Sequence, residues 1–196
     1  MTTPPSLRDR VGVLILDRAA AVLAEHGATA SMAEIATAAG IGRATLYRHF
    51  PNRDALLQAM AQAAVEELGD RLAQAQVGEV PVHEAIARVC RAFVTTGGKY
   101  IALRHTGHKP ADPDAVDQRI GAPLRTLLER GVQEGALRPD LAPELMTVFF
   151  SALIETGLTL AAQLGAEQAA ATIATLFLDG VGIRAARPTS GSGPDA

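Results

Sequence analysis

Three arginines near the N-terminus carry the most recognisable chemistry of the chain. Arg43, Arg48 and Arg53 lie within residues 40–53, a stretch that contains no Asp or Glu. A guanidinium group can bind O6 and N7 of a guanine with two hydrogen bonds, and it binds phosphate in a similar two-pronged way. The whole chain carries 18 Lys and Arg against 21 Asp and Glu, so any nucleic-acid site must be local.

The side chains between these arginines add smaller hydrogen-bonding groups. Thr45, Tyr47 and His49 carry hydroxyl or imidazole donors suited to phosphate oxygens. We expect Arg43 to bind a base edge and Arg53 to bind a phosphate. Arg48 could do either. Tyr47 has a second interpretation, as a half-buried aromatic that holds its helix to the first helix.

Two short helices are predicted to position these side chains. Ser31 and Glu34 have the spacing of a capping box, which begins a helix over 31–39. Gly40 then supplies the positive φ of a tight turn, and a second helix follows over 42–50. This order is typical of a helix-turn-helix, although a simple corner between two helices with solvated arginines fits the same pattern.

A longer run of residues around this pair of helices makes the signal more specific. The residues concerned are Ile15-Leu16, Ala19, Leu23, Glu25 and Gly27, then Ile35-Ala36, Ala39-Gly40-Ile41, Thr45-Leu46-Tyr47, His49-Phe50, Asn52-Arg53 and Leu56-Leu57. In their order and spacing, residues 8–60 resemble the DNA-binding domain of tetracycline-repressor (TetR) type transcriptional regulators. Three positions depart from the usual pattern: Gly42 stands where Ser is common, Ala44 where Gly is common, and Arg53 where Lys is common.

The resemblance implies a homodimer that binds double-stranded DNA at a palindromic operator. Each subunit would place its third helix in the major groove of one half-site, and an all-helical C-terminal domain would sense a small molecule. The candidate DNA-binding residues are Gly42, Arg43, Ala44, Thr45, Tyr47, Arg48, His49 and Arg53.

Apolar residues recur at helical spacing along almost the whole chain, and no sustained period-two pattern appears, so the predicted fold class is all-α. The predicted helices span about 7–26, 31–39, 42–50, 52–76, 81–96, a short segment after Gly98 that ends near 108, then 114–133, 141–164 and 166–183. These nine helices divide into a helix-turn-helix domain over 1–51 and a helical ligand-binding and dimerisation domain over 52–186. Residues 187–196 are expected to form a disordered tail.

The last two predicted helices carry small residues four positions apart. These stripes are Gly157, Ala161 and Gly165 on one helix and Ala166, Ala170 and Ala174 on the other. Small residues allow helix axes to approach closely, so the pair could form a four-helix bundle with a second copy. The alternative is that either stripe packs within one subunit.

Bulky apolar residues between the DNA-binding domain and these last helices could line a ligand pocket. The candidate ligand-binding residues are Phe93, Tyr100, Leu103, Leu128, Phe149, Phe150, Leu153 and Glu155. Such a lining indicates a largely apolar effector. Core packing is the alternative for each apolar residue, and Glu155 could instead face the dimer interface.

Signals for catalysis, cofactors or metals are weak, and we expect none of the three. His105 and His108 are three positions apart, but the intervening Gly and the expected loop favour exposure over metal binding. Cys90 lies in an apolar helical stretch and is expected to be an inert core thiol. A single Cys and the absence of a signal-peptide or membrane-spanning pattern indicate a cytoplasmic protein.

These observations together predict a ligand-responsive transcriptional regulator, most simply a repressor, that a small molecule releases from its operator. The alternative from another class is a helical small-molecule carrier or a metal-dependent enzyme that bears the same N-terminal motif. DNA binding separates the two, because a carrier would bind its ligand and ignore DNA.

Overall fold

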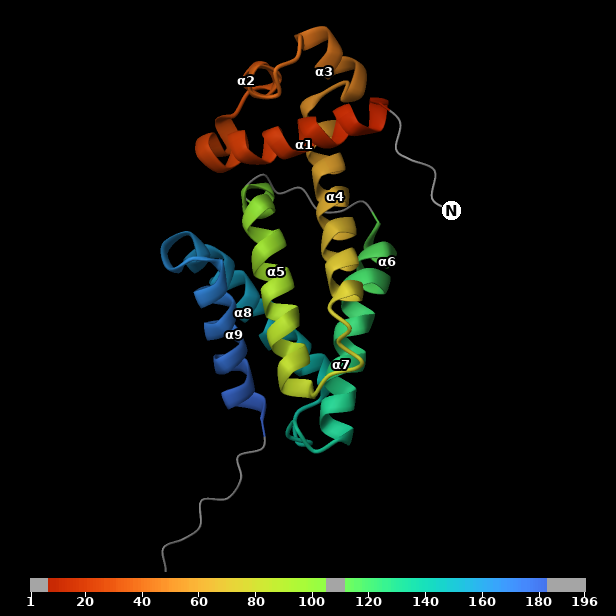
Figure 1. The fold of residues 1–196 in the computed structure, drawn as a ribbon, viewed down its shortest axis with the longest axis vertical. Helices are drawn as coiled ribbons and strands as arrows, with labels where there is room; N and C mark the ends of the chain where they lie inside the picture. The colour runs from red at the N-terminus through yellow and green to blue at the C-terminus, as the bar shows by residue number, and fades with distance from the viewer. Residues whose placement is uncertain (1–6, 105–111, 183–196) are drawn as a thin grey trace, which may run out of the picture.

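The computed structural model describes residues 7–104 and 112–182, and its regular elements there are all helical, which confirms the all-α fold class (Figure 1). The N-terminal elements are α1 (Leu7–His26), the short turn η1 (Gly27–Thr29), α2 (Met32–Ala38) and α3 (Arg43–His49). They are followed by α4 (Arg53–Gln74), α5 (Val82–Arg104), α6 (Pro113–Val116), the π-helical turn η2 (Asp117–Gly121), α7 (Ala122–Gln133), α8 (Pro143–Leu164) and α9 (Ala166–Val181).

The helices α1, α2 and α3 form one end of the molecule around their own apolar core (Figure 1). Ile15, Leu23, Ile35 and Leu46 are fully buried there. The packing does not stop at residue 51, because the first turns of α4 and Leu103 near the end of α5 belong to the same core. The N-terminal unit is therefore seated on the ends of two long helices.

A second, larger core lies among α4, α5, α7, α8 and α9. At its centre Phe150 meets Phe93 edge-on, with ring centroids 5.9 Å apart, and Phe177 in the same way at 5.1 Å. These contacts join α5, α8 and α9 in the geometry that aromatic rings prefer.

The predicted helix break at Gly97 and Gly98 is wrong, since α5 continues through both residues. A Cβ at Gly97 would lie 2.5 Å from a methyl carbon of Leu158 on α8. The glycine therefore permits the close approach of two helices, a role that the local sequence does not reveal.

The stretch from α6 through η2 to α7 is unbroken helix with a π-helical turn inside it, and matches the single helix predicted over 114–133. Counted in this way, the described residues form eight longer helical segments where nine were expected. The expected short helix that ends near 108 corresponds in part to the end of α5, and its last residues lie outside the described ones.

Among the described residues, α8 is the one helix that is long and apolar enough to cross a membrane. This differs from the sequence-based expectation of no membrane-spanning segment. This criterion uses length and composition only, and a helix that packs on other helices also meets it. One face of α8 does so, with Met146, Phe150 and Ile154 buried against the core.

Replacing Gly97 tests the close approach of α5 and α8. Gly97→Ala is expected to lower the free energy of unfolding by up to about 2 kcal/mol, because overpacking costs about 1–3 kcal/mol and the better helix propensity of Ala returns about 1 kcal/mol. Gly180→Ala in α9 is the control, since a Cβ there meets no atom within 4 Å, and it should be neutral or stabilising. Urea denaturation measures both, and equal effects would contradict the packing explanation.

Candidate nucleic-acid interface

The start of α2 is fixed by a complete capping box. The Ser31 hydroxyl accepts a hydrogen bond from the backbone N–H of Glu34 at 3.2 Å, and the Ser31 N–H donates to the Glu34 carboxylate at 2.7 Å. The backbone N–H of Ser31 and its hydroxyl both donate to the Glu34 carboxylate and hold the pKa of Glu34 below its usual value. The first turn of α2 therefore has a defined position, as the sequence predicted.

The turn between α2 and α3 has the hydrogen bonds of a Schellman motif. The N–H of Gly40 donates to the Thr37 carbonyl, and that of Ile41 to the Ala36 carbonyl, both at 3.0 Å. Gly40 has φ of +66°, which confirms the left-handed turn expected there. The helix α3 begins three residues later at Arg43, with Gly42 as an N-cap that makes no side-chain hydrogen bond.

One face of α3 is buried and the other faces solvent. Leu46 is fully buried in the N-terminal core, whereas Arg43 and Arg48 are exposed. Tyr47 keeps 48% of its surface exposed. Gly42 and Ala44 are exposed beside them.

Three of the predicted residues lie at the edge of this face and are half-buried: Thr45, His49 and Arg53. Arg53 begins α4, and one of its guanidinium nitrogens donates a hydrogen bond to the Ala30 carbonyl. This contact fixes the start of α4 to the segment before α2. Sequence reasoning missed it, because nothing near Arg53 in the chain indicates a distant carbonyl.

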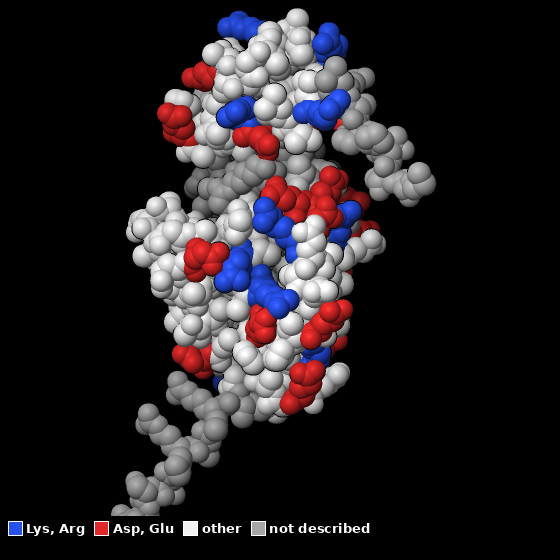
Figure 2. All heavy atoms as spheres, viewed as in Figure 1, with Lys and Arg blue, Asp and Glu red and all other residues white. Residues whose placement is uncertain are grey.

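Charge changes sign along the molecule. Residues 1–60 carry six Lys and Arg and five Asp and Glu, whereas 61–196 carry twelve and sixteen. Acidic side chains gather where the N-terminal unit meets the rest (Figure 2), around a hollow between α1 and α4 lined by Asp17, Glu66, Glu67 and Asp70. This hollow also includes Arg71, so its four acids and one arginine give it a net negative charge that repels a polyanion.

The structure does not gather the predicted ligand-binding residues around one cavity. Phe93, Leu128 and Phe150 belong to or pack on the larger core, and Leu103 packs in the N-terminal core instead. The remaining members lie elsewhere: Phe149 and Leu153 border an apolar groove between α8 and α9, Glu155 is exposed on α8, and the side chain of Tyr100 lies outside the described ones.

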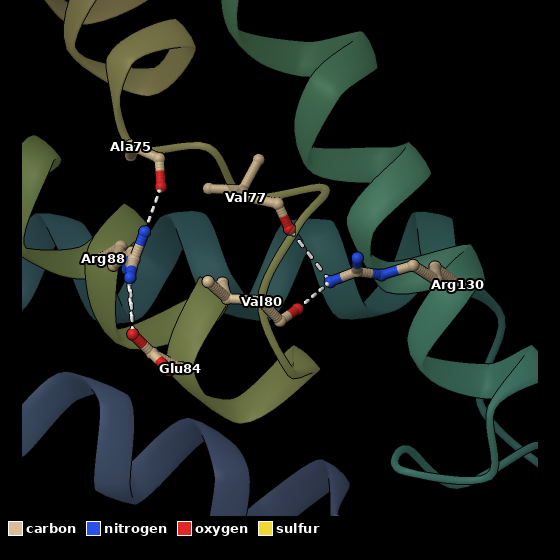
Figure 3. Close-up of polar contacts among 6 residues, drawn as sticks. All are labelled: Ala75, Val77, Val80, Glu84, Arg88 and Arg130. Atoms are coloured by element: carbon tan, nitrogen blue, oxygen red, sulfur yellow. Dashed lines mark hydrogen bonds and ion pairs between the residues drawn. The ribbon is translucent and has the colours of Figure 1, made fainter.

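Two arginines, Arg88 and Arg130, hold the turn between α4 and α5. Arg88 donates to the Ala75 carbonyl at 2.8 Å and pairs with Glu84 (Figure 3). Arg130 on α7 donates to the carbonyls of Val77 and Val80, at 2.9 and 3.0 Å, and also to that of Gly78. No sequence signal indicates these contacts, since the arginines reach carbonyls of other elements.

The described residues contain no group of three or more His, Cys, Asp or Glu placed to hold a metal ion. His105 and His108, the pair considered from the sequence, lie outside them. Cys90 is fully buried in the larger core, and this burial raises its pKa to about 12. Thr96 is also buried, and its hydroxyl has no hydrogen-bond partner in the part of the chain that the structure describes.

The comparisons with known proteins agree with this geometry. A family model described as bacterial regulatory proteins, tetR family, matches residues 15–60. The HTH-type transcriptional repressor LfrR of Mycolicibacterium smegmatis is 33% identical over 161 residues, which cover 79% of this chain and 83% of that protein.

Solved structures show the same likeness over most of the chain. The TetR-like transcriptional regulator LfrR from Mycobacterium smegmatis, in complex with proflavine, matches with a TM-score of 0.72 and 28% identity over 90% of this chain and 99% of its own. A TetR transcriptional regulator from Streptomyces coelicolor matches with a TM-score of 0.63 and 26% identity, over 89% and 99% of the two chains.

A capped α2, a glycine turn and an outward-facing α3 define a helix-turn-helix protein, the class whose second helix enters the DNA major groove. The chain belongs to the TetR family of transcriptional regulators. It is accordingly a DNA-binding regulator.

The burial of Cys90 predicts an unreactive thiol. Raising the pKa from 9.0 to about 12 lowers the thiolate fraction at pH 8 by roughly 1,000-fold. A disulfide reagent should therefore modify Cys90 slowly in the folded protein and rapidly in urea.

The same pKa shift gives the sign of a pH effect on stability. Folding favours the neutral thiol, so its contribution is complete below pH 9 and is lost as the pH rises toward 12. Unfolding free energies of the natural protein and of Cys90→Ala, measured from pH 8 to 11, should converge at high pH. In the modification test, a rapid reaction of Cys90 in the folded protein would contradict its burial.

Proposed function

We propose that this protein is a homodimeric repressor that binds a palindromic operator and is released from it by a small molecule. The observation that carries the proposal is the outward-facing surface of α3, with Arg43, Tyr47 and Arg48 exposed above a buried Leu46. The name of the relative LfrR, a transcriptional repressor, supports the sign of regulation.

Within this interface we assign different tasks to different residues. Arg43, at the first position of α3, is exposed and can reach base edges, where an arginine binds guanine bidentately. Thr45, Tyr47, His49 and Arg53 bind phosphates and fix the register of the helix in the groove. Gly42 and Ala44 present no long side chain, so the backbone at the start of α3 can approach the DNA closely.

The proposed dimer is formed through α8 and α9. These helices expose Leu145, Val148, Phe149, Leu160 and Leu164 on α8 and Leu176 on α9. A single subunit leaves this apolar face in water, whereas a second copy related by a two-fold axis would cover it and form a four-helix bundle. The same symmetry matches two half-sites of a palindrome.

Release by a ligand follows from the position of α4. A small molecule that binds preferentially to the state with wrongly spaced recognition helices shifts the population away from the DNA-binding dimer. Affinity depends on a separation of about 34–36 Å between half-sites, one turn of DNA. The relative LfrR has been crystallised in complex with proflavine, which supports a small-molecule effector for the present chain.

We also infer that the protein acts in the cytoplasm and is not an enzyme. Its relatives are transcriptional regulators. The apolar surface of α8 has an occupant in the proposed dimer and does not require a lipid bilayer.

Operator titrations test the two arginine tasks. Arg43→Ala is expected to cost about 1–3 kcal/mol on the cognate operator and to relax the preference at one base pair. Arg53→Ala should weaken all sequences alike, and its thermal melting must be compared because it also loses the bond to Ala30. Arg91→Ala, in an exposed ion pair with Glu167, is the control. A uniform loss for Arg43→Ala would remove its base-reading role.

A charge on the exposed face of α8 and α9 tests the dimer. Leu176 is 56% exposed, and Leu176→Glu is expected to raise the dimer dissociation constant at least about 100-fold, because an unpaired buried charge costs about 3–5 kcal/mol. Val13 on α1 is 60% exposed, and Val13→Glu should leave the dimer intact. Sedimentation equilibrium at micromolar concentration measures both, and a monomeric natural protein would overturn the proposal.

One experiment tests the whole function. Sequences bound from a pool of random DNA should share a palindrome, and the bound fragment should give a salt-dependent gel shift. Proflavine is a first small molecule to add, because a relative binds it. A protein that selects no sequence would contradict the proposed regulator and favour a carrier.

A further inference from the structure

A groove lies between the second half of α4, the turn that leads to α5, and the start of α7. It consists of two adjoining hollows of about 660 and 390 Å³ that share Val77, Gly78, Gln118 and Pro123. The groove is separate from the aromatic contacts at the centre of the core and is formed by none of the predicted ligand-binding residues.

The lining of this groove has the composition of a small-molecule site. Its apolar floor includes Leu72 and Leu127, which are buried, and Val77, which is half-buried. Two amide side chains, Gln76 and Gln118, stand exposed at its edge. An apolar floor with a few polar groups at defined positions is typical of ligand sites.

Two unusual backbone conformations border the same groove. Gln76 has φ of +49°, and it is the one residue other than glycine with positive φ in the described part of the chain. The opposite wall includes Gln118 and Arg119 of the π-helical turn η2. Left-handed residues that are not glycine, and π-helical turns within α-helices, are both enriched at functional sites.

The charged side chains that line the groove balance, with Arg119 and Arg130 against Asp70 and Glu79. The carbonyls at the C-terminal end of α4 and in the following turn would attract a cation, but Arg88 and Arg130 already bind those of Ala75, Val77 and Val80 (Figure 3). Arg130 also binds the carbonyl of Gly78. The negative potential of these carbonyls is therefore offset by two guanidinium groups.

Arg119 is the cation in the groove with hydrogen-bonding capacity to spare. It makes a single hydrogen bond of 3.3 Å, to Asp70 on α4, among the described residues. Arg125, six residues later, instead binds Asp117 through two bonds of 2.8 Å. The two acids that line the groove are Asp70 and the exposed Glu79, so a ligand must approach Arg119 between Asp70 and the apolar floor.

We propose that this groove binds a small apolar molecule that carries one carboxylate. The carboxylate lies on the fork of Arg119, in the bidentate geometry that guanidinium groups prefer, and the apolar part covers Leu72, Val77 and Leu127. As an effector site the groove rests on the proposed function. Arg119 of η2 bonds Asp70 of α4, and its side chain packs against Gly69, where an added Cβ would lie 3.0 Å from the Cβ of Arg119. A carboxylate that binds Arg119 therefore weakens the contact between η2 and α4.

A tryptophan placed in the groove reports binding directly, because the chain contains none. Thr126 is exposed and lines the groove, so Thr126→Trp provides the groove reporter, and Ala24→Trp on α1 provides a distant reporter far from it. The probes are decanoate, decanol and decyltrimethylammonium, which share one chain length and differ in charge, each used below its micelle concentration.

The expected result is a saturable fluorescence change with decanoate in the Thr126→Trp protein, with decanol weaker and the cation weakest, and no saturable change in the Ala24→Trp protein. Arg119→Gln, added to the groove reporter, should weaken decanoate binding at least about tenfold, since it removes a charge-assisted bidentate contact. Arg125→Gln is the matched control on the same segment and should change the affinity less than about twofold. Equal binding of the three probes, or unchanged decanoate affinity in Arg119→Gln, would overturn the proposal.

Because this titration contains no DNA, its outcome is separate from that of the proposed function. If the protein selects an operator but does not bind decanoate, the proposed ligand site is wrong and the proposed function stands. If the protein binds decanoate through Arg119 but selects no operator, the ligand site stands and the proposed function is wrong.

Discussion

The helix α4 is part of both apolar cores, as α5 is through Leu103, and the rest of the molecule depends on this constraint. Its first turns bury Leu56, Leu57 and Met60 among α1, α2 and α3. Its later turns bury Leu68 and Leu72 against α5 and the other helices of the larger core. Because interiors are close-packed, α4 cannot shift in one core without a response in the other. The position of α3 is therefore tied to the packing around the far end of α4.

Polar contacts act at both ends of this shared helix. At its start, Arg53 bonds the Ala30 carbonyl and the Asn52 side chain caps the first turn. At its end, Arg88 and Arg130 bind the carbonyls of the following turn. Between these ends, the contacts with η2 include Gly69 against Arg119 and one exposed ion pair of Arg119 with Asp70. Exposed single ion pairs contribute little to stability, so this middle contact is the one that a ligand can alter most easily.

The features of the N-terminal unit that the sequence predicted are those encoded by neighbouring residues. The capping box of Ser31 and Glu34 and the left-handed turn at Gly40 involve contacts within four or five positions, so the spacing alone determines them. Gly97 was misread because its role is set by Leu158 on another helix.

The same limit applies to the predicted pocket. Helical periodicity indicates that Phe93 and Phe150 point inward, but it does not indicate that the two rings contact each other and fill the interior. The groove beside Arg119 gave no sequence signal, because four separate parts of the chain, α4, the turn after it, η2 and α7, form it together.

The apolar face of α8 and α9 also bears on the spacing of the two recognition helices. α8 meets the hydropathy criterion for a membrane span because it is apolar on two faces, one packed on the core and one exposed. An exposed apolar face of this extent marks an interaction surface. In the proposed dimer this face meets its own copy across the two-fold axis, and α9 packs directly on α5, whose end enters the N-terminal core through Leu103. In this proposed dimer, the interface that removes apolar surface from water would also fix how far apart the two α3 helices lie, so the same contacts would set dimer packing and operator spacing.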